Sequence, residues 1–208
     1  MAFAWKRANP LGSLKLLLSH RQLIGLATID FIVNLAHQVL PSIFVLYAGY
    51  RYGWNETTVG LTLAFVGVST GVVSGFVVGP AVKRLGTRRA LLVGLAFGCL
   101  GMVIYGLAPT GAWFWVGVPV MSLWGLVGPS LLDLMSRRVS ESEQGQLQGA
   151  NSSLRSIAGL IGPAIFTTTF AWLLGWLPGA PFLLAALLLV AAAWLTWIVT
   201  RSAETQPP

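Results

Sequence analysis

Charge is what this sequence has least of. Asp, Glu, Lys and Arg together make up 9% of the 208 residues, whereas 55% of the residues are hydrophobic. Ordinary globular domains carry about 25% charged residues. A chain with so few charges cannot cover a surface that faces water, so its apolar excess must face lipid. The composition excludes a soluble protein and predicts an integral membrane protein.

Cysteine and histidine are also scarce. Cys99 is the one cysteine, which excludes a disulfide framework or a thiol-based metal site within one chain. The two histidines are His20 and His37. The sequence contains no GxSxG, no HExxH and no GxxxxGK[ST] pattern. We therefore expect no enzyme activity, no metal and no cofactor.

The few charges are mostly basic and gathered in short clusters. The stretch "VKRLGTRRA", Val82–Ala90, holds four of the thirteen cations, whereas residues 57–82 and 90–132 carry no charged side chain. The net charge is +7. A nucleic-acid-binding protein lines up its cations along a face that follows the phosphates. Clusters between apolar runs are typical of membrane loops instead, so we expect no nucleic-acid partner.

The apolar runs are long enough to cross a bilayer, which needs about 20 helical residues. Six are predicted, separated by short connections, so the fold class is all-α with six transmembrane helices. A cytoplasmic N-terminal segment (1–22) precedes the transmembrane domain (23–200) and a cytoplasmic tail (201–208) follows it. The predicted spans are Leu23–Ala48, Val59–Val82, Ala90–Ala108, Trp113–Leu134, Leu147–Trp176 and Pro181–Thr200.

The cations also predict the orientation of the chain. With six crossings, Arg51 is the one cation in a loop on one side, and eleven lie on the other. Cytoplasmic loops collect Lys and Arg, so both termini are predicted to be cytoplasmic in a multi-pass protein of the cell (inner) membrane. The eleven are Lys6, Arg7, Lys15, Arg21, Lys83, Arg84, Arg88, Arg89, Arg137, Arg138 and Arg201.

Prolines interrupt several spans, and the six spans divide into two sets of three. Proline removes a helical hydrogen bond and kinks the helix. Pro41 in the first set corresponds to Pro129 in the second, and Gly79-Pro80 corresponds to Gly162-Pro163. Interrupted helices at matching places in two inverted halves are typical of transporters. The pattern predicts a 3+3 inverted repeat.

Span two also carries a glycine every four residues, from Gly67 through Gly71 and Gly75 to Gly79. Small residues on one helix face let another helix approach closely. The contact serves either sliding during a conformational change or static packing, and the sequence leaves both open.

A polar face runs along span one. Asp30, Asn34 and His37 follow helical spacing, with Gln38 beside them, and such groups are costly in hydrocarbon. Burial disfavours a charged carboxylate, which suits reversible protonation. Asp30 and His37 are therefore candidates for proton coupling, and Asn34 and Gln38 for substrate contact. The alternative is an internal hydrogen-bond network that holds helices together.

Two charged residues lie at the edges of spans. Arg155 near the start of span five reaches the headgroups, pairs with an acid, or binds an anionic substrate group; the first is favoured. Asp133, at the end of span four, is interpreted as a solvated boundary residue.

Three stretches resemble a known family. They are "GYRYGWNETTVGLTLA" (Gly49–Ala64), "GPAVKRLGTRRAL" (Gly79–Leu91) and "MSRRVSESEQGQLQGANSSLRSIAGLIGP" (Met135–Pro163). Together they resemble the C-terminal half, helices 7–12, of a major facilitator superfamily transporter of the tetracycline-resistance-like drug:proton antiporter group. The resemblance covers nearly the whole chain and implies proton-coupled efflux of a small molecule by alternating access.

The resemblance also implies roles for individual residues. The basic loop would bind helix ends and acids on the cytoplasmic side and act as a gate, although setting topology alone would also explain its charge. Gln146 and Gln148 would join Arg155 as substrate-cavity candidates. The gating residues would be Gly79, Arg84, Gly86, Arg88 and Arg89.

The sequence departs from the family in two respects. Tetracycline exporters carry an aspartate in helix nine and a histidine in helix eight, and the matching positions here are Gly98 and Thr70. These departures speak against tetracycline itself as the substrate. The family also has an N-terminal half, so the expected partner is a missing six-helix half or a second copy of this chain. The alternative function is a membrane binding or assembly protein that does not transport.

Overall fold

The structure is a computed structural model that describes residues 21–201, with the side chains of residues 23–201. The predicted terminal segments, 1–22 and 201–208, fall almost entirely outside this range. All regular structure within the described residues is helical. In chain order, the elements are α2 (Arg21–His37), α3 (Val39–Tyr52), α4 (Glu56–Val72), the π-helical η2 (Val73–Val77), α5 (Val78–Leu85), α6 (Thr87–Leu107), α7 (Gly111–Ser122), the 3-10 helix η3 (Leu123–Leu126), α8 (Val127–Ser136), the 3-10 helix η4 (Glu141–Glu143), α9 (Gln144–Leu173) and α10 (Ala180–Arg201).

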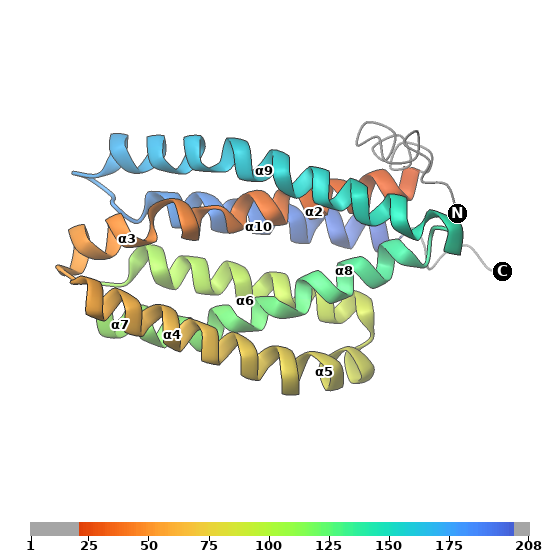
Figure 1. Cartoon of the computed structure of the whole chain (residues 1–208), viewed down its shortest axis with the longest axis horizontal. Helices are drawn as coiled ribbons and strands as arrows, with labels where there is room; N and C mark the ends of the chain where they lie inside the picture. Colours follow the sequence, from red (N-terminus) through yellow and green to blue (C-terminus); the bar gives the residue numbers. More distant parts are fainter. Residues whose placement is uncertain (1–20, 202–208) are drawn as a thin grey trace, which may run out of the picture.

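These elements form six rods that are long and apolar enough to cross a membrane. They run side by side along the long axis of the molecule, and their connections alternate between its two ends (Figure 1). The α5–α6 and α8–α9 connections share one end, which we call the basic end because it carries Lys83–Arg89 and Arg137–Arg138. The predicted fold class, an all-α membrane protein with six spans, is confirmed. The six rods are α2–α3, α4–η2–α5, α6, α7–η3–α8, η4–α9 and α10.

Three spans lose regular α-helical geometry, and each break precedes a proline. Pro41, Pro80 and Pro129 are each the third residue of the helix that follows the break, namely α3, α5 and α8. Proline has no N–H, so it leaves the carbonyl four residues earlier without its usual donor. In span one, the backbone N–H of Gln38 donates to the carbonyl of Leu35, three residues earlier, at 3.0 Å. An α-helix would bond it to the residue four positions earlier. The equivalent places of Pro41 and Pro129 agree with the predicted repeat.

Span five departs from the repeat pattern. Pro163, which corresponds to Pro80 in the predicted repeat, lies inside the continuous helix α9. Pro119 likewise lies within α7, and the break of span four follows it at Leu123–Leu126. A proline kinks a helix without always ending it, because neighbouring helices can hold the chain in place.

The core is centred on α6, which packs against α10 on one side and against α7, η3 and α8 on the other. Glycines permit the second contact: a Cβ atom on Gly94 would lie 2.9 Å from Val127 Cγ2, and one on Gly101 would lie 2.9 Å from the Met121 Cα. Close approach at small residues is how helices gain contact in lipid, where no hydrophobic force drives them together.

Aromatic rings fix the opposite end of the bundle. Tyr105 of α6 stacks on Phe114 of α7, with ring centroids 4.1 Å apart. Tyr47 of α3 donates a hydrogen bond to the Tyr105 carbonyl at 2.9 Å, and Tyr52 donates one to the Ala108 carbonyl at 3.1 Å. These bonds hold α3, the second half of span one, against α6.

The glycine face of span two makes no helix contact within the described chain. Added Cβ atoms on Gly67, Gly71, Gly75 and Gly79 would meet nothing within 4 Å. All four are exposed. The close contact that the four-residue spacing predicts is therefore not made by any helix of the described residues, because this face points away from the bundle.

Candidate functional site

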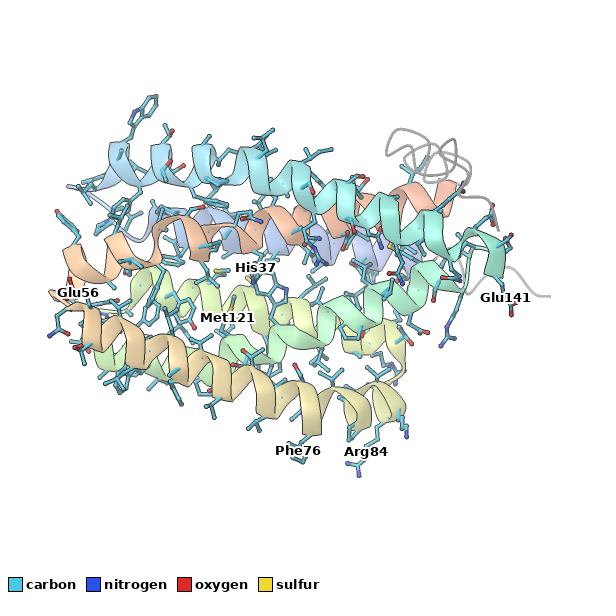
Figure 2. The ribbon with its side chains drawn as sticks, in the orientation of Figure 1. His37, Glu56, Phe76, Arg84, Met121 and Glu141 are labelled. Carbon is cyan, nitrogen blue, oxygen red and sulfur yellow. The ribbon has the colours of Figure 1, made fainter. Side chains whose placement is uncertain are left out.

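A cavity of about 590 Å³ lies between span one, span two, α6 and span four. Four aromatic residues contribute much of its apolar wall. In Figure 2 the labelled side chains of His37 and Met121 lie between the helices, at this place. Among the described residues, those that line the cavity include no Asp, Glu, Lys or Arg. Its aromatic residues are Phe44, Tyr105, Phe114 and Trp124, and its side chains with hydrogen-bonding groups also include Asn34, His37, Thr70 and Ser122.

Residues at two of the helix breaks line this cavity. His37 and Gly125 both line it, and each precedes a proline by four residues, Pro41 and Pro129. Their carbonyls therefore cannot accept the usual hydrogen bond within the helix. Irregular backbone at membrane depth is tolerated where it lies beside a cavity, and both of these residues do.

Trp124 in η3 positions His37. The two rings lie 5.3 Å apart at an angle of 49°. Trp124 also lies against Gly98 of α6, where an added Cβ would be only 2.9 Å from the Trp124 Cγ. The indole ring therefore fills the space beside Gly98.

The polar face of span one divides between two environments. Asn34 and His37 line the cavity, whereas Asp30 and Gln38 do not. Asn34 Nδ2 donates to the Asp30 carbonyl at 2.8 Å. The Asp30 Oδ2 atom is buried and has no hydrogen-bond partner among the described residues. Gln38 faces α9, where an added Cβ on Gly162 would lie 2.5 Å from its Cβ.

The candidates on α9 lie apart from the cavity. Gln146, Gln148 and Arg155 are not among the lining residues. Gln146 is half-buried, whereas Gln148 and Arg155 are exposed. Arg155 belongs to α9, which packs against α2, the helix that carries the polar face of span one.

The predicted gating loop forms the turn between α5 and α6. Gly86 has φ +77°, a conformation that L side chains rarely adopt. Arg88 Nε donates to Thr200 Oγ1 at 2.8 Å, which links the loop to α10. Arg84 and Arg89 are exposed, as is Gly79, and Arg84 points away from the bundle in Figure 2.

The loop does bind an acid, but through a threonine. Thr87 Oγ1 donates to Asp133 Oδ2 at 2.7 Å, which ties the start of α6 to α8. Arg137 pairs with the same carboxylate at 2.8 Å. The interpretation of Asp133 as a solvated boundary residue is therefore incomplete: it is half-buried and joins two helices at the basic end.

Sequence reasoning missed the cavity residues outside span one. Tyr105, Phe114, Ser122 and Trp124 are uncharged and lie in ordinary apolar runs. Of these residues, Trp124 alone was marked by its place in the sequence. Several other tryptophans lie near the predicted ends of spans, where indole rings prefer the headgroup level. Trp124 instead falls in the middle of a predicted span.

The fold and the cavity define a class of protein: a multi-pass membrane protein whose interrupted helices enclose an apolar cavity with a few polar groups. Residues 3–163 match the sequence pattern of the Major Facilitator Superfamily. The match covers more than half of the chain, so the chain belongs to this superfamily.

Its relatives include several tetracycline resistance proteins. The class C protein of Escherichia coli is 35% identical over 188 residues, which are 86% of this chain and 47% of that protein. The class G protein of Vibrio anguillarum is 34% identical over 202 residues, 93% of this chain and 51% of that protein. The class B protein of Escherichia coli is 30% identical over 187 residues, 82% of this chain and 44% of that protein. The chain spans about half the length of these relatives.

Proposed function

We propose that this chain is one half of a proton-coupled secondary transporter that exports a small, largely apolar compound by alternating access. The cavity carries the proposal, because its aromatic walls and few polar groups suit such a compound. The names of the relatives, which are tetracycline resistance proteins, support drug efflux as the direction. Tetracycline itself is not the proposed substrate, since Gly98 and Thr70 stand where the resemblance implies an aspartate and a histidine.

Asp30 and His37 are the proposed proton carriers. Both are titratable groups on span one. His37 is the last residue of α2, directly before the helix break, and Asp30 lies about two turns earlier. His37 meets the cavity directly, and Asp30 is joined to the cavity residue Asn34 by a hydrogen bond at its backbone carbonyl. Intramembrane ionisable groups are usually functional because they are otherwise costly.

The proposed partner is a second six-helix unit, either an N-terminal half or another copy of this chain. The glycine face of span two supports this, since it leaves room for the close approach of a further helix. In the proposed orientation the basic end faces the cytoplasm and the protein lies in the inner membrane, in keeping with the excess of Lys and Arg at that end.

The test uses this chain co-expressed with the N-terminal half of a relative, in inverted membrane vesicles energised by a proton gradient. We expect uptake of amphipathic drugs into the vesicles. A protonophore, which dissipates the proton gradient, should abolish this uptake. Asp30→Asn should abolish coupled uptake at unchanged expression. Thr28→Val, on the exposed side of the same helix, is the matched control and should transport normally.

Two results would contradict the proposal. Drug accumulation that is no greater than in vesicles with the N-terminal half alone would exclude transport by this chain. Normal proton-driven uptake by Asp30→Asn would remove Asp30 from the coupling residues and leave His37 as the candidate.

A further inference from the structure

Tyr105 of α6 brings a hydroxyl group to the wall of the cavity. The residue is only 2% exposed, yet its hydroxyl forms no hydrogen bond with any of residues 23–201. The polar atoms of this part of the chain that are closed off without a partner are Asp30 Oδ2, Ser130 Oγ and Asn151 Oδ1. Because the Tyr105 hydroxyl is not one of them, it is open to the cavity that the residue lines.

The ring that carries this hydroxyl is held in place from several sides. Its centroid lies 4.1 Å from that of Phe114, and the two rings are nearly parallel at 11°. A Cβ atom added to Gly117 would lie 2.9 Å from Tyr105 Cε1, and the Phe182 ring meets the tyrosine at 72°. The Tyr47 hydroxyl donates to the Tyr105 carbonyl at 2.9 Å. A donor on so fixed a ring is pre-organised, so a ligand loses little free energy in ordering it.

Two other polar side chains of the cavity already donate to the chain itself. Ser122 Oγ donates to the Val118 carbonyl at 2.9 Å, which leaves this hydroxyl only its lone pairs. Asn34 Nδ2 donates one of its N–H groups to the Asp30 carbonyl at 2.8 Å. The O–H of Tyr105 has no such acceptor among the described residues. A buried donor without an acceptor is unfavourable, so a ligand that supplies an acceptor relieves this cost.

The walls around Tyr105 favour a ligand without charge. The cavity lining within the described residues includes no Asp, Glu, Lys or Arg, so a charged ligand finds no counter-ion there. Phe114 stacks on Tyr105 and also on Phe44, whose ring centroid lies 5.5 Å away at an angle of 30°. Stacking covers the electron-rich ring faces that attract cations and leaves the electron-poor edges. These edges favour an electron-rich, uncharged group over a cation.

We propose that Tyr105 is a specificity-determining residue of the cavity, and that its hydroxyl donates a hydrogen bond to the carbonyl oxygen of an uncharged aromatic compound. The rings of the compound lie against the apolar wall. A site built to bond a polar group rejects an analogue that lacks it, because the buried group of the site is then left unpaired. Export of such a compound rests on the proposed function, whereas its binding to this chain does not.

A pair of probes that differ in one group tests the proposal on this chain in nanodiscs. Fluorenone and fluorene have the same three fused rings, but fluorene has a methylene group in place of the carbonyl. Saturable binding of each radiolabelled probe is measured after subtraction of binding to empty nanodiscs. We expect Tyr105→Phe to weaken fluorenone binding about 2- to 12-fold, which corresponds to one neutral hydrogen bond. Fluorene binding should stay unchanged, which also shows that the variant is folded.

The infrared carbonyl band of bound fluorenone gives a readout that a purely structural role of Tyr105 would not move. A hydrogen bond to the oxygen lowers the stretching frequency, so the band should lie lower in the parent chain than in Tyr105→Phe. The matched control is Tyr50→Phe, which removes a hydroxyl from a residue that is 56% exposed and does not line the cavity. This control should change neither the affinity nor the band.

The preference for an uncharged ligand is tested with methylacridinium, a flat three-ring cation, which should bind less tightly than fluorenone. Three results would overturn the proposal. They are unchanged fluorenone binding in Tyr105→Phe, equal losses of fluorenone and fluorene binding in that variant, and methylacridinium binding as tight as that of fluorenone. The second result would make the ring, and not the hydroxyl, the determinant.

The outcome is separable from that of the transport experiment. Binding that depends on the Tyr105 hydroxyl, in a chain that does not transport with an N-terminal half, would keep the site and refute only the proposed function. Proton-driven drug uptake together with unchanged fluorenone binding in Tyr105→Phe would keep the proposed function and refute the role of Tyr105.

Discussion

Gly98 is the position where the structure makes its sharpest mechanical prediction. A methyl group added by Gly98→Ala would lie 2.9 Å from the Trp124 Cγ and 3.2 Å from Leu189 Cδ1. The indole has little room to withdraw, because the centroid of the His37 ring lies 5.3 Å from its own. Overpacking of this kind costs about 1–3 kcal/mol. For a chain of this size, that lowers the unfolding midpoint by about 2–12 °C, taking about 2–4 °C per kcal/mol.

The assay is thermal unfolding of the purified chain in detergent, read by loss of helix signal. Gly71→Ala is the matched control, since its added methyl group meets nothing within 4 Å, and alanine favours a helix over glycine by about 1 kcal/mol. Trp124→Ala should remove the cost, so that Gly98→Ala is harmless in that background. Equal midpoints for Gly98→Ala and Gly71→Ala would refute the close contact and with it the positioning of His37 by Trp124.

Two further predictions concern the ends of the bundle. Gly179→Ala should prevent stable folding, because the added Cβ would overlap the Gly106 carbonyl. The free energy of unfolding should fall by well above about 3 kcal/mol. A folded, thermostable Gly179→Ala chain in the same unfolding assay would contradict this packing of the α9–α10 connection on α6. Thr87→Val should cost about 0.5–1.5 kcal/mol by removing the bond to Asp133, measured by denaturant unfolding, and Thr87→Ser should retain most of it; equal losses for valine and serine would show that the hydroxyl is not what matters.

The sequence was most informative where physical constraints are strongest. Lack of charge and the length of the apolar runs predict six membrane helices, because a helix satisfies its own backbone polar groups in lipid. Pro41 and Pro129 likewise mark the breaks, since a proline has no N–H to donate. The polar face of span one was visible because Asn34 and His37 are expensive in hydrocarbon, and both residues line the cavity.

The rest of the site depends on contacts between helices far apart in the sequence. Trp124 and Phe114 look like ordinary apolar residues until α6 and span four come together. The bond from Thr87 to Asp133 spans 46 positions in the chain, and no local pattern indicates it. The glycine face of span two illustrates the opposite limit: Gly67 and Gly71 predict close packing, yet no helix within the described residues packs there.

The most direct test of the account is the sidedness of its loops. In a Cys99→Ser background, single cysteines at Thr57, Lys83 and Glu141 would be treated in intact cells with a membrane-impermeant thiol reagent. All three parent residues are exposed, Thr57 near the opposite end and the other two at the basic end. We predict that Thr57→Cys reacts from outside, whereas Lys83→Cys and Glu141→Cys react only after permeabilisation. Reaction of Thr57→Cys and Lys83→Cys from the same side would contradict a membrane-spanning helix between them and the account that rests on it.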